Sequence, residues 1–349
     1  MYKNIIFCLS YLNIPITLQL IENYGADRSL VITNNDSLFE FFSYLYGEQI
    51  LFSTEKPSKY AEFYNQINPI KGSLYFLISW VNRIKYKKIF LSISDKDVYF
   101  FIKGYAIFEA FIVKLLSKNN EIFYKRSVDL SQLKGYETVL VKIQKKLIKA
   151  FYGVEVDVLN NADRPLFALS NEFLNNIKVN FFELPDNIQR VKKPIIDKFD
   201  IGKYKGVLLS GNTVDENFVQ KNDFVKNNDK LIKYMMKKFG KNNLALKLHP
   251  RYNTKYSKEH QLPEINKVIP VSLIADSFDF IIGYASAALF ETANNGGLSI
   301  STLEYFEPIS TNMKNKYIDY LHNNLIKGNN IYYFKNLQEL ENIFNLFGL

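Results

Sequence analysis

The sequence has little cysteine and little histidine. Among its 349 residues Cys8 is the only cysteine, and the three histidines are His249, His260 and His322. A single cysteine cannot form a disulfide framework, and this set of residues excludes a cysteine-ligated metal site. Cys8 lies in a segment that we expect to be a core strand, where a thiol packs as a small apolar side chain.

Long hydrophobic runs are also missing. No stretch reaches the roughly 18 to 20 apolar residues of a membrane-spanning helix, and the most apolar run is residues 74–81. Residues 1–21 faintly resemble a signal peptide, but polar residues interrupt the apolar run and no small-residue cleavage site follows. We therefore expect a cytoplasmic protein, and peripheral contact with the inner face of the cytoplasmic membrane is compatible with this sequence.

The charge is positive but dispersed. The formal net charge is +9, from 44 lysine and arginine residues against 35 aspartate and glutamate residues. Without a block of like charges the sequence does not indicate a nucleic-acid-binding tail, although a basic face could attract anionic substrates or anionic lipid. Hydrophobic residues make up 47% and aromatic residues 15%, which is enough for a substantial core and excludes global disorder.

The first half alternates strand-like and helix-like segments. This rhythm is typical of a mostly parallel sheet covered by helices. We expect the chain to begin with a strand, a polar turn and a helix opened by Pro15. The expected strands are 5–9, 29–33, 49–53, 88–92 and 121–124, and the other expected helices lie near 37–46, 72–85, 103–118 and 136–151.

Residues 184–205 change character, with two prolines, many charges and no clean periodicity. We interpret them as a linker between two Rossmann-like domains, 1–185 and 186–349, because a chain of this length favours two domains. The second domain repeats the pattern, with expected strands at 206–210, 244–248, 278–283 and 331–334 and expected helices at 228–239, 287–294 and 336–347. The predicted fold class is α/β, in the GT-B arrangement of two doubly wound domains facing a cleft.

The most informative segment is the basic stretch around His249. Alternation places Lys247 and His249 on one face of a strand, and Pro250 ends that strand because it cannot donate to a ladder. Open α/β sheets bind ligands at the carboxyl ends of their strands. Lys247, His249 and Arg251 at such an end suit a phosphate, although a solvated strand end in a lysine-rich chain would look the same.

Two further segments follow expected strands of the second domain. Ser286 precedes the helix at 287–294 as an N-cap, a role worth about 1 kcal/mol, and the free N–H groups at such an end also attract phosphate. Asp215 and Glu216 are adjacent acids in a turn. They either form a solvated loop or, at a cleft, provide a general base for an acceptor hydroxyl.

In this order, the acidic pair, the His-Pro segment and the Ser motif resemble bacterial sialyltransferases. The similarity is to the lipooligosaccharide, capsule and O-antigen sialyltransferases, which are related in motif to the capsule polysialyltransferases. These families carry an acid-acid-Gly turn, a Lys-x-His-Pro-Arg-like segment and a Ser-Ser/Thr pair. The resemblance covers about residues 206–295, whereas the first half shares only the general βα pattern.

The resemblance implies an inverting transfer from CMP-sialic acid to a hydroxyl of a galactose-terminated bacterial surface glycan. Glu216 would be the general base, with Asp215 as its fallback, and His249 would donate a proton or hydrogen bond to the departing CMP phosphate. Ser286 would bind the same phosphate. The first domain would bind the acceptor and the second the donor. Neither a metal nor another cofactor is expected.

Other residues complete the expected donor site. On physical grounds Lys247 and Arg251 suit the phosphate or the carboxylate of sialic acid. The remaining expected donor-site positions are Gly211, Asn212, Pro250, Ser272 and Ala287.

The sequence departs from the family pattern at three places. Asn217 stands where glycine is expected, and Ala287 replaces the second hydroxyl of the Ser pair. The glutamate expected after a proline to bind the ribose is absent from residues 269–272, where Ser272 or backbone groups would take that role. The donor could therefore be a related nonulosonic acid.

Three other functions are compatible with the sequence. Asp95-Lys96-Asp97 follows a strand-like segment and matches the D-x-D signature of metal-dependent GT-A transferases, although a solvated turn explains it as well. A GT-B enzyme could instead use CMP-Kdo or a UDP-sugar. A nucleotide- or glycan-binding protein could also have kept the fold and lost catalysis.

Overall fold

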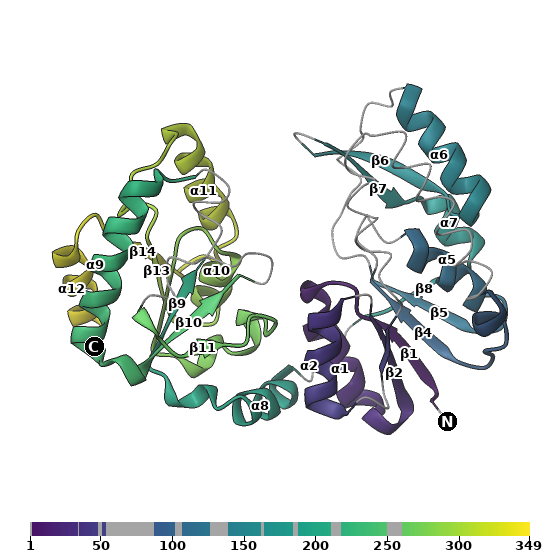
Figure 1. Ribbon diagram of the computed structural model, residues 1–349, viewed down its shortest axis with the longest axis horizontal. Helices are drawn as coiled ribbons and strands as arrows, with labels where there is room; N and C mark the ends of the chain where they lie inside the picture. Colours follow the sequence, from purple (N-terminus) through teal and green to yellow (C-terminus); the bar gives the residue numbers. More distant parts are fainter. Residues whose placement is uncertain are drawn as a thin grey trace. The chain divides into compact units, whose positions relative to one another are not determined.

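The computed structural model describes residues 2–33, 35–47, 51–53, 87–101, 107–125, 139–161, 164–183, 188–210, 218–249 and 260–349. The chain divides into two compact units, Met1–Asn187 and Ile188–Leu349. Each unit contains a six-stranded parallel sheet flanked by helices (Figure 1). No helix in the described part of the chain is long and apolar enough to cross a membrane.

The sheet of the first unit has the strand order β3-β2-β1-β4-β5-β8. Its strands are β1 (Asn4–Phe7), β2 (Ser29–Thr33), β3 (Leu51–Ser53), β4 (Asp97–Phe100), β5 (Glu121–Tyr124) and β8 (Asn180–Phe181). The helices are α1 (Ile14–Tyr24), α2 (Asp36–Tyr46), α5 (Ile107–Leu116), α6 (Val139–Tyr152) and α7 (Asn171–Asn176). A separate antiparallel hairpin joins β6 (Val156–Asn161) to β7 (Arg164–Leu169).

The core of the first unit lies between one face of its sheet and the helices α5, α6 and α7. Phe7, Val98 and Phe100 contribute fully buried side chains from β1 and β4. Ile112 of α5 and Ile148 of α6 meet them from the helical layer. Because side chains alternate between the two faces of a strand, this packing fixes which residues of β4 point to each side.

The second unit repeats the same topology, with the strand order β11-β10-β9-β12-β13-β14. Its strands are β9 (Gly206–Ser210), β10 (Leu244–Leu248), β11 (Glu264–Ile265), β12 (Phe280–Gly283), β13 (Leu298–Ser301) and β14 (Ile331–Tyr333). The helices are α8 (Ile188–Lys198), α9 (Lys221–Phe239), α10 (Ala287–Asn294), α11 (Thr311–Asn323) and α12 (Leu337–Leu346). In both units the strands follow the order 3-2-1-4-5-6 of a Rossmann fold, which confirms the predicted α/β class of two doubly wound sheets.

An aromatic cluster forms the centre of the second core. The ring of Phe280 on β12 is fully buried. It lies 4.8 Å from the ring of Phe239 on α9 and 5.0 Å from that of Phe344 on α12. Leu244 and Leu246 of β10 join the same core, so the predicted leucine face of that strand is confirmed.

Most strongly patterned elements match their predicted positions. β2, β9, β10 and α10 have the expected bounds, and Pro15 opens α1 as expected. Gln49 and the expected helix at 72–85 lie outside the described residues.

Two predictions of secondary structure are wrong. Residues 87–91 are helical and not a strand, because a short apolar run cannot be assigned to helix or strand by periodicity alone. The expected irregular linker contains α8, which buries Val191 and Ile195 although Pro194 lies inside it. β13 is an element that the sequence analysis did not predict, and its Ser299 and Ser301 are fully buried in the sheet.

A glycine allows β9 to approach β12. Gly206 is paired with Phe280, and a Cβ at Gly206 would lie 2.0 Å from Cζ of that ring. We expect Gly206→Ala to destabilise the second unit by about 1–3 kcal/mol, since overpacking forces the buried ring to move. Amide hydrogen exchange in β9 and β12 should become faster.

The matched control is Gly202→Ala. A Cβ at Gly202 would lie 3.7 Å from Cγ2 of Ile196, an ordinary van der Waals contact. Exchange in β9 and β12 should stay at the wild-type rate in this variant. Equal protection in the two variants would contradict the proposed clash.

Candidate functional site

The strand order of the second unit defines one favoured ligand position. The chain winds outward from β9 through β10 to β11 and then restarts on the other side of β9 with β12. In open α/β sheets, ligands bind outside the carboxyl ends of the strands at such a switch point. Ser210 ends β9 and Gly283 ends β12, so these two residues mark the site.

A small hollow lies at this switch point. Ser210, Gly283, Tyr284 and Thr302 line it at the strand ends, together with Asn228 of α9 and apolar core residues. Backbone and hydroxyl groups are thus gathered where a polar ligand could contact them.

His249 lies beside the end of β9. Its backbone N–H donates to the carbonyl oxygen of Ser210 at 3.0 Å, which extends the parallel pairing one residue beyond β10. The half-buried side chain therefore starts next to the switch point. The fold thus brings His249 next to Ser210, although the two residues are 39 positions apart in the sequence.

Lys247 is buried inside the second unit. Its residue is only 5% exposed, and its Nζ donates to the carbonyl oxygens of Lys267 at 2.8 Å and Leu248 at 3.2 Å. Burial lowers the pKa of this ammonium group to about 7. No ion pair to Lys247 occurs among the described residues, and its predicted contact with the donor stays a prediction.

Ser286 forms the N-cap of α10. Its Oγ accepts a hydrogen bond from the N–H of Ala288 at 3.3 Å, and its backbone is extended as a cap requires. Ala287 is the first residue of this eight-residue helix. The first turn of a helix leaves N–H groups without intrahelical acceptors, so this end suits an anion.

The end of β13 holds the loop before α10. The N–H of Thr302 donates to the carbonyl oxygen of Gly283 at 2.8 Å, and Oγ of Ser301 donates to that of Tyr284 at 2.7 Å. These bonds tie the end of β12 and the start of the following loop to the end of β13. The short helical segment Val271–Leu273, which contains half-buried Ser272, packs against α10 as well.

Glu291 is a candidate that sequence reasoning missed. It lies on α10, five residues after Ser286, and burial raises the pKa of its carboxyl group. The signal in the sequence was an acid within the otherwise uncharged helix Ala287–Asn294. A half-buried carboxyl group with a raised pKa is a candidate for a functional role.

Several predicted site residues lie outside the described residues. They are Gly211, Asn212, Asp215, Glu216 and Asn217 in the segment after β9, and Pro250 and Arg251 after His249. Their expected roles stay predictions.

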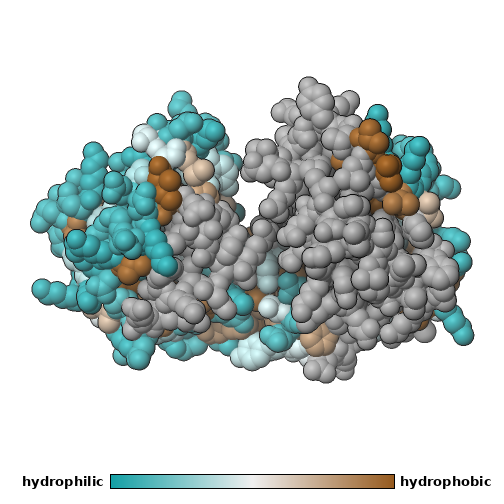
Figure 2. Space-filling model, turned by 45° about the horizontal axis from the view of Figure 1, so that its top comes forward, coloured by the Kyte–Doolittle hydropathy of each residue, from teal (hydrophilic) through white to brown (hydrophobic). Residues whose placement is uncertain are grey.

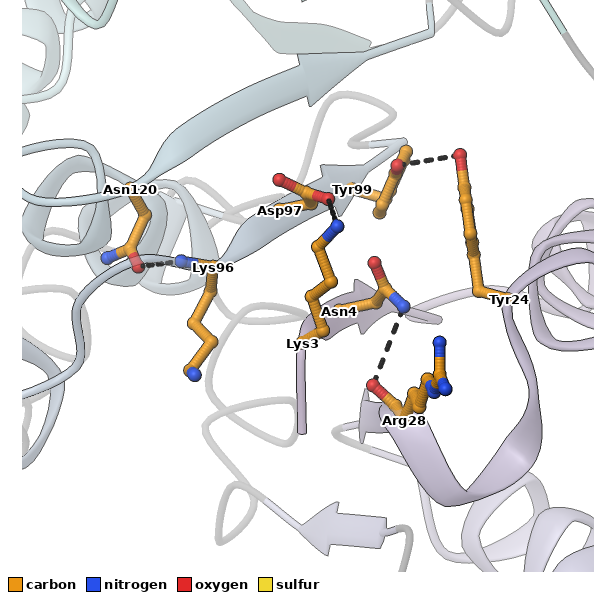
Figure 3. Close-up of polar contacts among 8 residues, drawn as sticks. All are labelled: Lys3, Asn4, Tyr24, Arg28, Lys96, Asp97, Tyr99 and Asn120. Carbon is orange, nitrogen blue, oxygen red and sulfur yellow. Dashed lines mark hydrogen bonds and ion pairs between the residues drawn. The ribbon is translucent and has the colours of Figure 1, made fainter. Parts of the chain in front are cut away.

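The D-x-D segment lies in the first unit, at the amino-terminal end of β4. Asp97 begins β4, and one of its carboxylate oxygens lies 4.0 Å from Nζ of Lys3 (Figure 3). The N–H of Lys96 donates to Asn120 at 2.9 Å. Ligands of such sheets bind at the carboxyl ends of strands, so this position does not favour the nucleotide-diphosphate site of a GT-A enzyme.

Comparison with known proteins gives similarity in fold only. No protein-family model matches the sequence, and no curated protein does. Solved structures match along most of the chain, at low identity. They include an E. coli heptosyltransferase WaaC (9% identity, 88% of this chain and 91% of that one, TM-score 0.39), a Methanocaldococcus jannaschii UDP-GlcNAc 2-epimerase (14%, 99% and 100%, 0.41) and a glycosyltransferase VinC (10%, 95% and 86%, 0.41).

Because these identities and TM-scores are low, the class of the protein follows from its own structure. The chain is an α/β protein with two Rossmann-like sheets, the architecture expected of the GT-B class. Its candidate site lies at the switch point of the second sheet, between β9, β10 and the start of α10.

The buried ammonium group of Lys247 predicts a pH dependence. An unfolded lysine keeps its proton up to about pH 10.4, whereas folded Lys247 releases it near pH 7. Between these values the unfolded state binds more protons, so the free energy of unfolding should rise with pH. We expect Lys247→Met to remove this rise, measured as urea unfolding followed by circular dichroism between pH 7 and pH 10.

Lys241→Met is the control for that measurement. Lys241 is exposed just before β10, so its removal should leave the pH slope unchanged. A slope that is the same in wild type and Lys247→Met would show that Lys247 stays protonated in the folded protein.

Proposed function

We propose that the chain is a glycosyltransferase that binds a nucleotide-sugar donor at the switch point of its second unit. One observation carries this proposal: His249 beside the carboxyl end of β9 shares a sheet edge with the Ser286-capped start of α10. A histidine and a helix N-terminus are both suited to a phosphate that gains negative charge. The parallel sheet supports this reading because phosphates are commonly bound at this edge.

The more specific proposal is an inverting sialyltransferase. The order of the acidic pair, the His-Pro segment and the Ser motif supports it. Glu216, or Asp215 in its place, would take the proton from an acceptor hydroxyl, whose oxygen then bonds to the anomeric carbon of sialic acid. The bond from that carbon to the phosphate oxygen breaks, and His249 stabilises the charge on the departing CMP.

The proposed substrates follow from the same motifs. The donor is CMP-sialic acid and the acceptor a galactose-terminated bacterial surface glycan, bound by the first unit. The reaction needs no metal or other cofactor, and it takes place in the cytoplasm. One observation favours a related donor: Ala287 occupies the first position of α10, so Ser286 supplies the only side-chain hydroxyl there. A transferase that uses CMP-Kdo, a UDP-sugar or a nonulosonic acid related to sialic acid is therefore the second candidate.

The first test is CMP release from CMP-sialic acid in EDTA, with a panel of galactose-terminated acceptors. We expect release to be stimulated by an acceptor in wild type. His249→Ala and Glu216→Gln should each lower the rate by about 10²–10⁴-fold, the usual contribution of general acid–base catalysis.

Three outcomes would change the proposal. A folded protein that releases no CMP with any acceptor would contradict sialyl transfer, and other CMP- and UDP-sugars would be tested next. Release that needs manganese would contradict metal independence. Binding of CMP without turnover, unchanged in Glu216→Gln, would indicate a binding protein.

Ser286 provides a separate test of phosphate binding. Asp and Asn are both good N-caps, so Ser286→Asp and Ser286→Asn should both preserve α10. Only the aspartate places a negative charge beside the phosphate. We therefore expect the Kd of Ser286→Asp for CMP to be about tenfold higher than that of Ser286→Asn. Isothermal titration calorimetry measures this ratio. Equal affinities would mean that the phosphate does not lie at α10.

A further inference from the structure

Helix α6 of the first unit has an outer face that the described residues of its own unit leave exposed. Val139 is 75% exposed and Ile143 is 50% exposed. Lys142 and Lys146 are also exposed, and their spacing places them on the same side of the helix. We call these four residues the α6 outer face.

The inner face of the same helix accounts for its stability. Val141, Ile148 and Tyr152 are 4%, 0% and 4% exposed, and all three belong to the core of the first unit. These contacts fix the rotation of α6 about its axis. The two large aliphatic side chains of the outer face therefore cannot turn inward, and none of the described residues of the unit buries them.

The charge of α6 is of one sign. The helix, VLVKIQKKLIKAFY, contains four lysines and no acid. At its carboxyl end Lys149 forms an ion pair with Glu155. Within the described residues no ion pair involves Lys142 or Lys146, and both lysines lie on the same side of the helix as Val139 and Ile143. In Figure 2 hydrophobic residues are exposed next to hydrophilic ones on the part of the first unit where Figure 1 draws α6.

We propose that the α6 outer face docks on an anionic lipid surface. Aliphatic side chains of an amphipathic helix enter the boundary between headgroups and acyl chains, and neighbouring lysines are attracted to anionic headgroups. The α6 outer face contains both kinds of side chain within two helical turns. The basis is the exposure and charge of this helix, so the inference stands independently of the proposed glycosyl transfer.

Charge argues against two other occupants. A second copy of the chain paired through a two-fold axis would place the lysines of one α6 near those of the other, and like charges repel. A nucleic acid would satisfy the lysines but would leave Val139 and Ile143 exposed, because single strands bind on aromatic side chains. An anionic lipid surface can bind the two lysines through its headgroups and bury the two aliphatic side chains.

The test is co-sedimentation of the full chain with vesicles of phosphatidylcholine alone or with added phosphatidylglycerol. No donor or acceptor is needed, so failure of this test is distinct from failure of the catalytic proposal. We expect binding to the phosphatidylglycerol vesicles that weakens as salt rises. The double variant Lys142→Gln/Lys146→Gln should lower the partition coefficient about 25-fold, at about fivefold per lysine.

The aliphatic residues have a distinct signature. Val139→Ser/Ile143→Ser should lower the partition coefficient by about tenfold or more while keeping the salt dependence, because it removes the apolar contribution alone. Both variants alter exposed side chains, so their circular dichroism spectra should match that of the wild type.

Lys226→Gln/Lys230→Gln is the matched control. These lysines are exposed on α9 of the second unit and have the same spacing of four residues. The control removes the same charge and should leave vesicle binding close to that of the wild type.

Four results would overturn the proposal. They are equal binding to neutral and anionic vesicles, an equal loss in the α9 control, a dimer by sedimentation velocity that the α6 variants dissociate, and single-stranded DNA binding that needs Lys142 and Lys146 but not Val139 and Ile143. The last two would assign the face to a second copy or to a nucleic acid.

Discussion

The parallel pairing of β9 with β10 on one side and β12 on the other is the constraint on which the candidate site depends. It requires close contact of Gly206 with the ring of Phe280, which the aromatic cluster of α9 and α12 holds in the core. With that register in place, Ser210, His249 and Gly283 end at one edge of the sheet. A shift of any of these strands would separate the groups that we propose to bind the phosphate.

Backbone carbonyl groups hold several polar side chains near this edge. Lys247 is kept inside the second unit by two carbonyl oxygens, and burial of its charge opposes folding at neutral pH. Ser301 and Thr302 bond to the loop that leads to Ser286. The core thus offsets the burial of polar groups around a site whose shape it also maintains.

The two proposals assign different surfaces to different tasks. The switch point of the second unit would bind the nucleotide-sugar donor, and the α6 outer face of the first unit would bind lipid. Each uses a helix that is fixed by its buried side, Leu289 for α10 and Ile148 for α6. The remaining face or end of each helix is then free to present charge or N–H groups outward.

The sequence by itself determined the elements with strong local patterns. The alternating leucines of β10, the glycine-led β9 and the Ser286-capped α10 follow from residues close together in the chain, because periodicity and capping are local effects. The position of His249 at a strand end follows from the same patterns. Only the tertiary structure decided which side chains are covered. Lys247 and the two serines of β13 are buried in it, and the D-x-D segment lies at the amino-terminal end of β4. Burial and sheet order depend on segments distant in sequence, which no local pattern contains.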